Sequence, residues 1–170
     1  CIVGEFDDNV ILQVKNGPFD FQVREPVSPL LLAMERTNMA LEVQLAQEYT
    51  GHQIDIYAMP PMWKEIFDDL PQERITAMAA VGNLGRDMNY TGHPFAAVNL
   101  FAFGLTAWNP DIDSTALIRT WCRLTYALPS AQEDALVSLL LGSRGVYEKY
   151  TAPLGLCWMV EPHGHYGPSP

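Results

Sequence analysis

The sequence is poor in three features that mark whole classes of protein: paired cysteines, clustered positive charge and long apolar runs. Its 3 cysteines, Cys1, Cys122 and Cys157, are widely spaced, so we expect buried thiols rather than a disulfide framework or a Cys-x-x-Cys metal site. With 10 Lys plus Arg against 20 Asp plus Glu, the net charge of -10 argues against a nucleic-acid partner, because affinity for phosphate backbones comes from clustered cations. No apolar run reaches the roughly 18 residues that cross a bilayer, so no membrane partner is expected.

The N-terminus also lacks the basic, apolar and small-residue order of a signal peptide. The chain starts at Cys1 rather than Met, and a strand pattern follows almost at once, so we expect a piece cut from a longer protein. The localisation of that protein, cytoplasmic or secreted, therefore stays open. What is present, 170 residues of which 48% are hydrophobic, is enough for one ordinary globular core.

Short β-branched or alternating runs that stop at turn residues predict strands. Three such runs are NVILQVK at 9–15, MALEVQLA at 39–46 and MAAVGNLG at 78–85, and a fourth strand is expected in LTAW at 105–108, before Asn-Pro. Helices are expected at 29–36, 62–70 and 95–103, from a cap at Asp113 or Ser114, and from a cap at Ser130. Strand and helix thus alternate, which favours an α/β fold of parallel βα units amounting to half of a (β/α)8 barrel.

The predicted strands separate polar from apolar residues by parity. Gln13 and Lys15 alternate with apolar neighbours, and Glu42, Gln44 and Glu48 do the same on the second strand. In a parallel barrel one face of each strand looks into the lumen, which branched apolar residues usually fill. Ionisable side chains on the lumen side near the strand ends are therefore candidates for function.

Three charged residues near these strand ends are the main candidates, and each has a plain structural alternative. Asp20 closes a Gly-Pro turn and Glu48 follows a strand, where either acid can simply be solvated. Lys15 is one of three lysines in an acidic chain, at the end of an apolar strand where a buried ammonium needs an anionic partner. That partner is either Asp20 or Glu25, in a structural ion pair, or the carboxylate of a substrate.

The segment NVILQVKNGPFDFQVREPVSP at 9–29 closely resembles the one that follows the fifth barrel strand of glycoside hydrolase family 67 α-glucuronidases. Further segments resemble family segments in the same order: ALEVQLAQEYTG at 40–51, YAMPPMWKE at 57–65, AVGNLGRDMNYTGH at 80–93, LTAWNPDI at 105–112, EKYTAPLGL at 148–156 and HYGP at 165–168. The resemblance covers essentially the whole chain. It implies the second half of a (β/α)8 TIM barrel at residues 1–127 and the start of a truncated α-helical C-terminal domain at 128–170.

This resemblance implies hydrolysis, with inversion, of the α-1,2 bond between (4-O-methyl)-D-glucuronic acid and xylose in glucuronoxylan oligosaccharides. Aldouronic acids are then the expected ligands. Asp20 of KNGPFD and Glu48 of AQEYTG match the family's pair of carboxylates that activate the hydrolytic water, and which of the two takes the proton is left open. Inversion requires acid and base carboxyls roughly 6.5 to 9.5 Å apart, so that water fits between them. Lys15 is implied to hold the uronate carboxylate.

Several polar or aromatic residues further along are weaker candidates. Arg86, Asp87, Asn89 and Tyr90 follow the third strand, where they either reach the sugar or are only solvated; Arg86 and Asn89 are the substrate-binding candidates. Trp108, at the end of the expected fourth strand, either stacks on a sugar or packs at the barrel rim.

The resemblance implies neither a metal nor another cofactor. His163 and His165 have a spacing that metal ligands use, but no Cys or acidic ligand motif accompanies them, so a structural role or one near the xylose side is preferred. Two other interpretations stay open. One is a metal-dependent hydrolase on a TIM barrel that uses the 4 His and the acids, and the other is a catalytically inert sugar-binding fragment.

The chain departs from the family pattern in what it omits. The family's general acid and further carboxylate-binding basic residues lie upstream of this chain, and position 90 is more usually Trp than Tyr. A half barrel exposes two unpaired sheet edges, so we expect the isolated piece to be inactive. Related bacterial enzymes dimerise through the C-terminal domain, which makes the longer protein a candidate homodimer.

Overall fold

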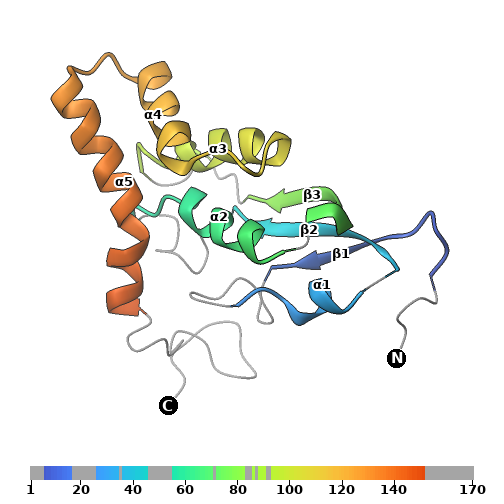
Figure 1. Cartoon of the computed structure of the whole chain (residues 1–170). Helices are drawn as coiled ribbons and strands as arrows, with labels where there is room; N and C mark the ends of the chain where they lie inside the picture. The colour runs from blue at the N-terminus through green and yellow to red at the C-terminus, as the bar shows by residue number, and fades with distance from the viewer. Residues whose placement is uncertain are drawn as a thin grey trace.

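The computed structural model describes residues 6–16, 26–34, 36–45, 55–70, 72–82, 86, 88–90 and 93–151. Its elements in chain order are β1 (Ile11–Lys15), α1 (Pro29–Ala33), β2 (Asn38–Gln44), α2 (Pro60–Asp69), the 3-10 turn η1 (Gln72–Arg74), β3 (Ile75–Val81), α3 (Ala97–Trp108), α4 (Ser114–Thr125) and α5 (Ser130–Thr151) (Figure 1). In these ranges each strand is followed by a helix. The first three expected βα units are therefore confirmed.

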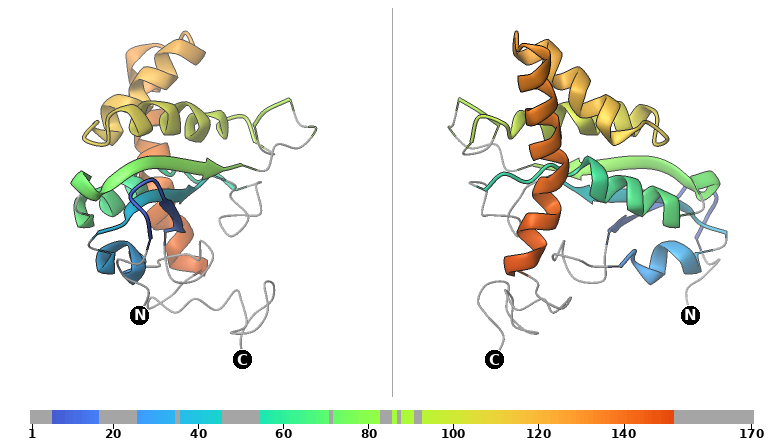
Figure 2. Two further views of the ribbon diagram at one scale, coloured as in Figure 1. Left: turned by 90° about the vertical axis from the view of Figure 1, so that its right-hand side faces the viewer. Right: turned by 60° about the vertical axis from the view of Figure 1, so that its left-hand side comes forward.

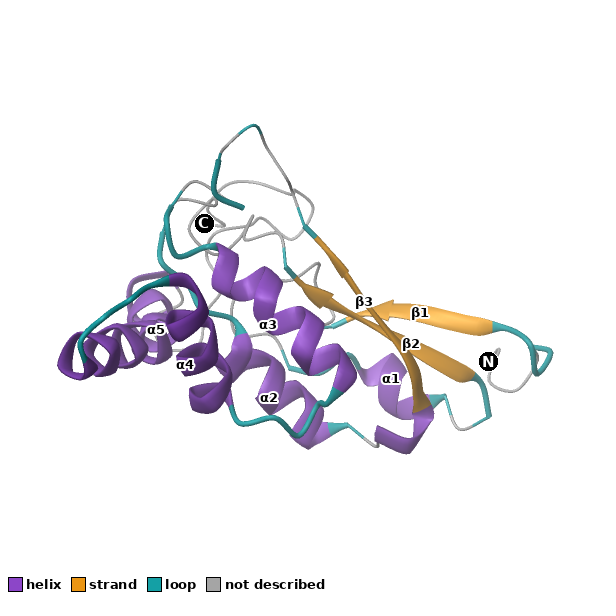
Figure 3. Ribbon diagram, turned by 90° about the horizontal axis from the view of Figure 1, so that it is seen from above, coloured by secondary structure: helices purple, strands orange, loops and turns teal. Residues whose placement is uncertain are grey.

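The three strands form one parallel sheet in the order β1-β2-β3. Lys15 aligns with Glu42, and Gln44 aligns with Val81, so the carboxyl ends of the strands lie along one edge of the sheet. Helices α2 and α3 lie side by side along the sheet, as Figure 3 shows. The long helix α5 stands beyond the carboxyl ends of the strands, where the views in Figures 1 and 2 agree. The carboxyl ends of all three strands, on which the candidate site depends, thus lie next to one another.

The two faces of the sheet differ in polarity, as the alternation of residues along the sequence predicts. Val14, Leu41 and Val43 are buried and belong to the main core, together with Trp63 and Phe67 of α2. In-register residues of parallel strands point to the same face, so Gln13, Lys15, Glu42 and Gln44 share the opposite face. The Gln13 amide donates a hydrogen bond to the Glu42 carboxylate at 2.5 Å. One face of the sheet therefore packs on helices, and the other carries a row of polar side chains.

The fourth strand predicted at residues 105–108 is wrong, because these residues form the last turn of α3. The buried residues of α3 are Val98, Asn99, Ala102 and Thr106, whose spacing is helical. The Asn109 N–H donates to the Leu105 carbonyl, so the Asn-Pro pair ends a helix and not a strand. Among the described residues the sheet has three strands, one fewer than the half barrel that the sequence predicted.

Helices α4 and α5 begin where the sequence predicts. Asp113 Oδ1 accepts a hydrogen bond from the Ala116 N–H at 2.8 Å, the contact of an N-cap, and α5 starts at Ser130. The expected burial of the Cys122 thiol is confirmed, whereas Cys1 and Cys157 lie outside the described residues. No helix in the described part of the chain is long and apolar enough to span a membrane.

A cluster of charges joins α4 to the first turn of α5. The Glu133 carboxylate accepts hydrogen bonds from Arg123 Nε at 3.0 Å and from Arg119 Nη1 at 2.6 Å. Arg119 also contacts Asp134 at 2.6 Å. The Arg123 hydrogen bonds, followed by that of Arg119, hold the pKa of Glu133 below its ordinary value. Glu133 thus links two arginines on α4 to α5.

We expect Glu133→Gln to lower the melting temperature by a few degrees at neutral pH. Because the folded-state pKa of Glu133 is lowered, its contribution is present above the ordinary carboxyl pKa and is lost as pH falls through the folded-state pKa. The gap between wild type and variant should therefore close in acid. Thermal melts from neutral to acidic pH measure it, with Asp69→Asn, an exposed acid at the end of α2 and outside this cluster, as the matched control. A gap that is constant across this range would contradict the ionic explanation.

Candidate functional site

The carboxyl edge of the sheet gathers the ends of the three strands and the residues that follow them. The Asn16 N–H donates to the Glu42 carbonyl at 2.8 Å, so the exit of β1 is fastened to β2. Leu45 is buried at the exit of β2, and Gly82 follows β3. Asp20 and Glu48, the two carboxylates that the sequence singles out, lie outside the described residues. The structure does describe the strand ends from which both residues follow.

Lys15 is the last residue of β1 and lies on the polar face of the sheet. Its side chain is exposed, and its position in register is beside Glu42. Glu42 is 8% exposed and Gln44 is 4% exposed, so the polar row continues into the interior from β1 to β2. Lys15 is therefore an exposed cation at one end of a polar row whose members on β2 are buried.

The candidate residues after β3 differ in how far they are exposed to solvent. Arg86 and Asn89 are exposed, and Asp87 lies outside the described residues. Tyr90 is 9% exposed, and its hydroxyl donates to the Leu45 carbonyl at 3.0 Å. Burial raises the pKa of Tyr90 to about 12, so it remains a neutral donor at physiological pH. Tyr90 is directed into the protein, while Arg86 and Asn89 remain open to solvent.

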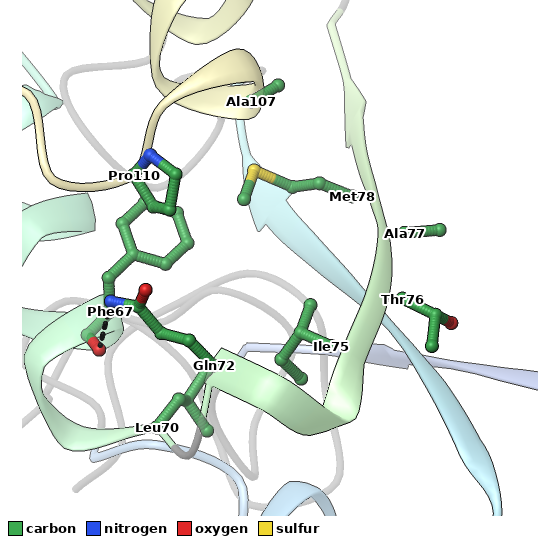
Figure 4. A pocket seen from close by; sticks show the side chains of 9 residues that line it. All are labelled: Phe67, Leu70, Gln72, Ile75, Thr76, Ala77, Met78, Ala107 and Pro110. Carbon is green, nitrogen blue, oxygen red and sulfur yellow. Dashed lines mark hydrogen bonds between the residues drawn. The ribbon is translucent and has the colours of Figure 1, made fainter.

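Trp108 is not at the end of a strand, because it is the last residue of α3 and is 90% exposed. Its neighbours Ala107 and Pro110 line a cavity of about 180 Å³ with Ile75, the first residue of β3 (Figure 4). This places Trp108 beside the amino end of β3, opposite the carboxyl edge. The reason for expecting it at the rim was therefore wrong, and its stacking on a sugar stays a prediction without that support.

The segment between β2 and α2 is held by two buried side chains that the sequence analysis missed. Asn99 of α3 accepts from the Met59 N–H at 2.9 Å and donates to the Tyr57 carbonyl at 2.8 Å. Ser143 Oγ of α5 accepts from the Ala58 N–H at 2.9 Å. These contacts hold the chain where it enters α2, after the segment that carries Glu48.

A buried histidine lies just before α3. His93 is 7% exposed, and neither ring nitrogen has a hydrogen-bond partner among the residues that the structure describes. Burial lowers the pKa of His93, an effect that Asp55 opposes, so the ring is neutral at physiological pH. Within the described ranges no group of three or more His, Cys, Asp or Glu residues could hold a metal ion. His163 and His165 lie outside those ranges.

Comparison with protein families gives two adjacent matches from one family. Residues 2–77 match the model described as "Glycosyl hydrolase family 67 middle domain". Residues 91–170 match the model described as "Glycosyl hydrolase family 67 C-terminus". The first match includes all of β1, β2 and α2, and the second includes all of α3, α4 and α5.

Similar proteins carry names that agree with these matches. The chain is 39% identical to "Probable alpha-glucuronidase A" of Aspergillus flavus in an alignment of 186 residues that covers 98% of this chain and 22% of that protein. It is 37% identical to "Alpha-glucuronidase A" of Emericella nidulans over 185 residues and 37% identical to "Alpha-glucuronidase A" of Aspergillus tubingensis over 186 residues. The chain spans 22% of the length of each of these relatives.

Proposed function

Because this chain belongs to glycoside hydrolase family 67, we propose that it is part of a longer enzyme that removes (4-O-methyl)-D-glucuronic acid from xylose in glucuronoxylan oligosaccharides. The bond hydrolysed is the α-1,2 linkage, and the anomeric configuration is inverted. Asp20 and Glu48 activate the hydrolytic water, while the general acid comes from outside this chain. The observation that carries the proposal is the parallel sheet whose polar row ends at the edge from which both acids follow.

The distances along the chain support a shared water. Asp20 follows Asn16 by four residues, and Glu48 follows Leu45 by three residues. An extended chain reaches roughly 3.5 Å per residue, so these segments span at most about 14 Å and about 11 Å. Adjacent parallel strands are only about 4.8 Å apart, which leaves both carboxylates able to meet at one solvent molecule. The two acids then titrate as a coupled pair.

The reaction proceeds by attack of this water on the anomeric carbon from the side opposite the leaving xylose. One carboxylate accepts a proton from the water, and the second orients the same water by accepting a hydrogen bond from its other O–H group. Protonation of the xylose oxygen by the general acid completes the cleavage. A gap of roughly 6.5 to 9.5 Å between acid and base accommodates the water and produces inversion.

Lys15 supplies the charge that distinguishes a uronic acid from a neutral sugar. Its exposed ammonium lies on the polar face, beside Glu42 in the register. A charge-assisted hydrogen bond to the uronate carboxylate contributes about 1.5 to 3 kcal/mol. Exposed Arg86 and Asn89, on the loop that follows β3, are proposed to contact the sugar hydroxyls.

We expect Lys15→Met to raise KM for aldouronic acids by about 10- to 150-fold, the equivalent of that binding energy. Steady-state kinetics and melting of the longer enzyme measure the two effects separately. Lys64→Met is a matched control, since Lys64 forms an ion pair with Asp68 within α2 and has no proposed role in binding the sugar. A loss of folding in Lys15→Met that accounts for the whole loss of activity would support the structural ion pair instead.

The organisation of the longer enzyme is also a proposal. We place the division between barrel and helical C-terminal domain at residues 127 and 128, after α4, and we expect a homodimer. The chain alone lacks the general acid and is expected to be inactive. Incubating the longer protein with an aldouronic acid and detecting free glucuronic acid tests the proposed function; binding without any release would favour an inert sugar-binding protein.

A further inference from the structure

We propose that Tyr90 is a positioning residue that fastens the loop carrying Arg86 and Asn89 to the exit of β2, from which Glu48 follows. The inference rests on the proposed function, because it assigns a role in organising the same site. It concerns a residue that does not itself face solvent. Its physical basis is a hydrogen bond and a close packing contact between two segments that are far apart in the sequence.

The hydrogen bond joins the β3 loop to β2. The Tyr90 hydroxyl donates to the Leu45 carbonyl at 3.0 Å, across a sequence separation of 45 residues. Leu45 is 4% exposed and Tyr90 is 9% exposed, so water does not compete freely for either group. A buried carbonyl that loses its donor is left unsatisfied, which opposes any separation of the two segments. The bond therefore fixes the β3 loop against the last described residue before Glu48.

The packing contact closes the loop on itself. Tyr90 lies directly against Gly82, the residue that follows β3, so both ends of the loop containing Arg86 and Asn89 meet. A β-carbon at Gly82 would overlap the Tyr90 hydroxyl and lie 3.1 Å from ring carbon Cζ. Only glycine leaves room for the ring to reach Leu45 in this arrangement. The close contact of Tyr90 with the end of β3 thus depends on glycine at position 82.

These two contacts join the exits of β2 and β3. Exposed loop residues have many accessible conformations, and each must be restricted before a sugar is bound in a reactive pose. By joining the loop of Arg86 and Asn89 to the residue from which the Glu48 segment follows, Tyr90 removes part of this conformational freedom before the sugar binds. A misplaced carboxylate lowers the rate of water attack more than it weakens substrate binding.

The test is Tyr90→Phe in the longer enzyme, which keeps the ring against Gly82 and removes the hydrogen bond to Leu45. We expect kcat for release of glucuronic acid to fall on the order of tenfold, with KM changed less than about threefold, because misplacement affects the reacting geometry. Tyr126→Phe is the matched control. The Tyr126 hydroxyl also donates to a backbone carbonyl, that of Pro94 at 3.3 Å, but this bond joins the end of α4 to the segment before α3 and not β3 to β2.

A second pair of variants tests the contact from the glycine side. Gly82→Ala should lower kcat at least as much as Tyr90→Phe, because the added methyl displaces the tyrosine hydroxyl from Leu45. Once the hydroxyl is absent, the same methyl has less to displace. In the double variant Gly82→Ala/Tyr90→Phe, the kcat losses should therefore be clearly less than multiplicative.

The outcomes separate this inference from the proposed function. A wild-type enzyme that releases no glucuronic acid overturns both. An active wild type whose kcat falls no further in Tyr90→Phe than in Tyr126→Phe, at comparable melting temperatures, overturns the role of Tyr90 alone. Fully multiplicative kcat losses in the double variant would also count against a shared contact. A kcat loss confined to the Tyr90 and Gly82 variants supports it.

Discussion

Replacing Asp20 or Glu48 by its amide in the longer enzyme lowers kcat for release of glucuronic acid by about 10²- to 10⁴-fold, the range that general acid–base catalysis contributes. The amide keeps the size of the side chain and can no longer accept the proton of the attacking water. The larger of the two losses identifies the base, and the smaller identifies the residue that orients the water. Steady-state kinetics on a defined aldouronic acid measure both.

The control for these variants is Asp69→Asn at the end of α2, an exposed acid remote from the strand exits, for which we expect unchanged kinetics. Melting temperatures of all three variants should stay close to that of the wild type. If either amide variant retained most of the wild-type kcat, water activation by the pair would be wrong for that residue. If both lost activity only because they failed to fold, the acids would be structural.

Trp63→Ala is expected to destabilise the protein by about 4 kcal/mol, in the range measured for removal of large buried aromatic side chains. Trp63 is fully buried in α2, and its ring meets Phe103 of α3 edge to face at a centroid distance of 6.1 Å. Its indole N–H donates to the Gln44 carbonyl at 3.1 Å, at the end of β2. The substitution leaves a cavity between two helices and the central strand, together with an unsatisfied carbonyl.

Trp63→Phe separates the contribution of the buried ring from that of the indole N–H donor. It keeps most of the apolar ring and removes the N–H donor, so we expect a loss of about 1 to 3 kcal/mol from the unsatisfied carbonyl and the smaller ring. Urea unfolding followed by circular dichroism compares the variants with the wild type. A loss below about 1 kcal/mol for Trp63→Ala would mean that α2 is not fixed to the sheet through this residue.

Local sequence signals predicted the parts of the fold that depend on local physics. The first two strands were predictable because polar and apolar residues alternate along them, and Asp113 was predictable because an N-cap needs only its own helix. The third strand was predicted from a small apolar run at 78–85, and the structure places it three residues earlier at its start, at Ile75–Val81. The LTAW segment was misread because a short apolar run before Asn-Pro fits a strand end as well as the last turn of a helix. That choice is decided by the buried positions 98, 99, 102 and 106, which follow helical spacing over the whole of α3.

The residues that organise the strand exits were harder to predict, because their partners are distant in the sequence. Asn99 binds the backbone of Tyr57 and Met59, and Ser143 binds that of Ala58 at a separation of 85 residues. Neither residue type in a helix indicates such a contact by itself. Gly82 was the one usable signal, since a glycine at the end of a strand favours a close approach by another group.

The central claim is that Asp20 and Glu48 direct one water onto the anomeric carbon from the face opposite the leaving xylose. Proton nuclear magnetic resonance of the first glucuronic acid released by the longer enzyme tests it most directly, before the anomers equilibrate. Inversion of an α-linkage predicts the β-anomer as the first product. Initial appearance of the α-anomer would contradict the claim, because it would require a covalent intermediate in place of direct attack by water.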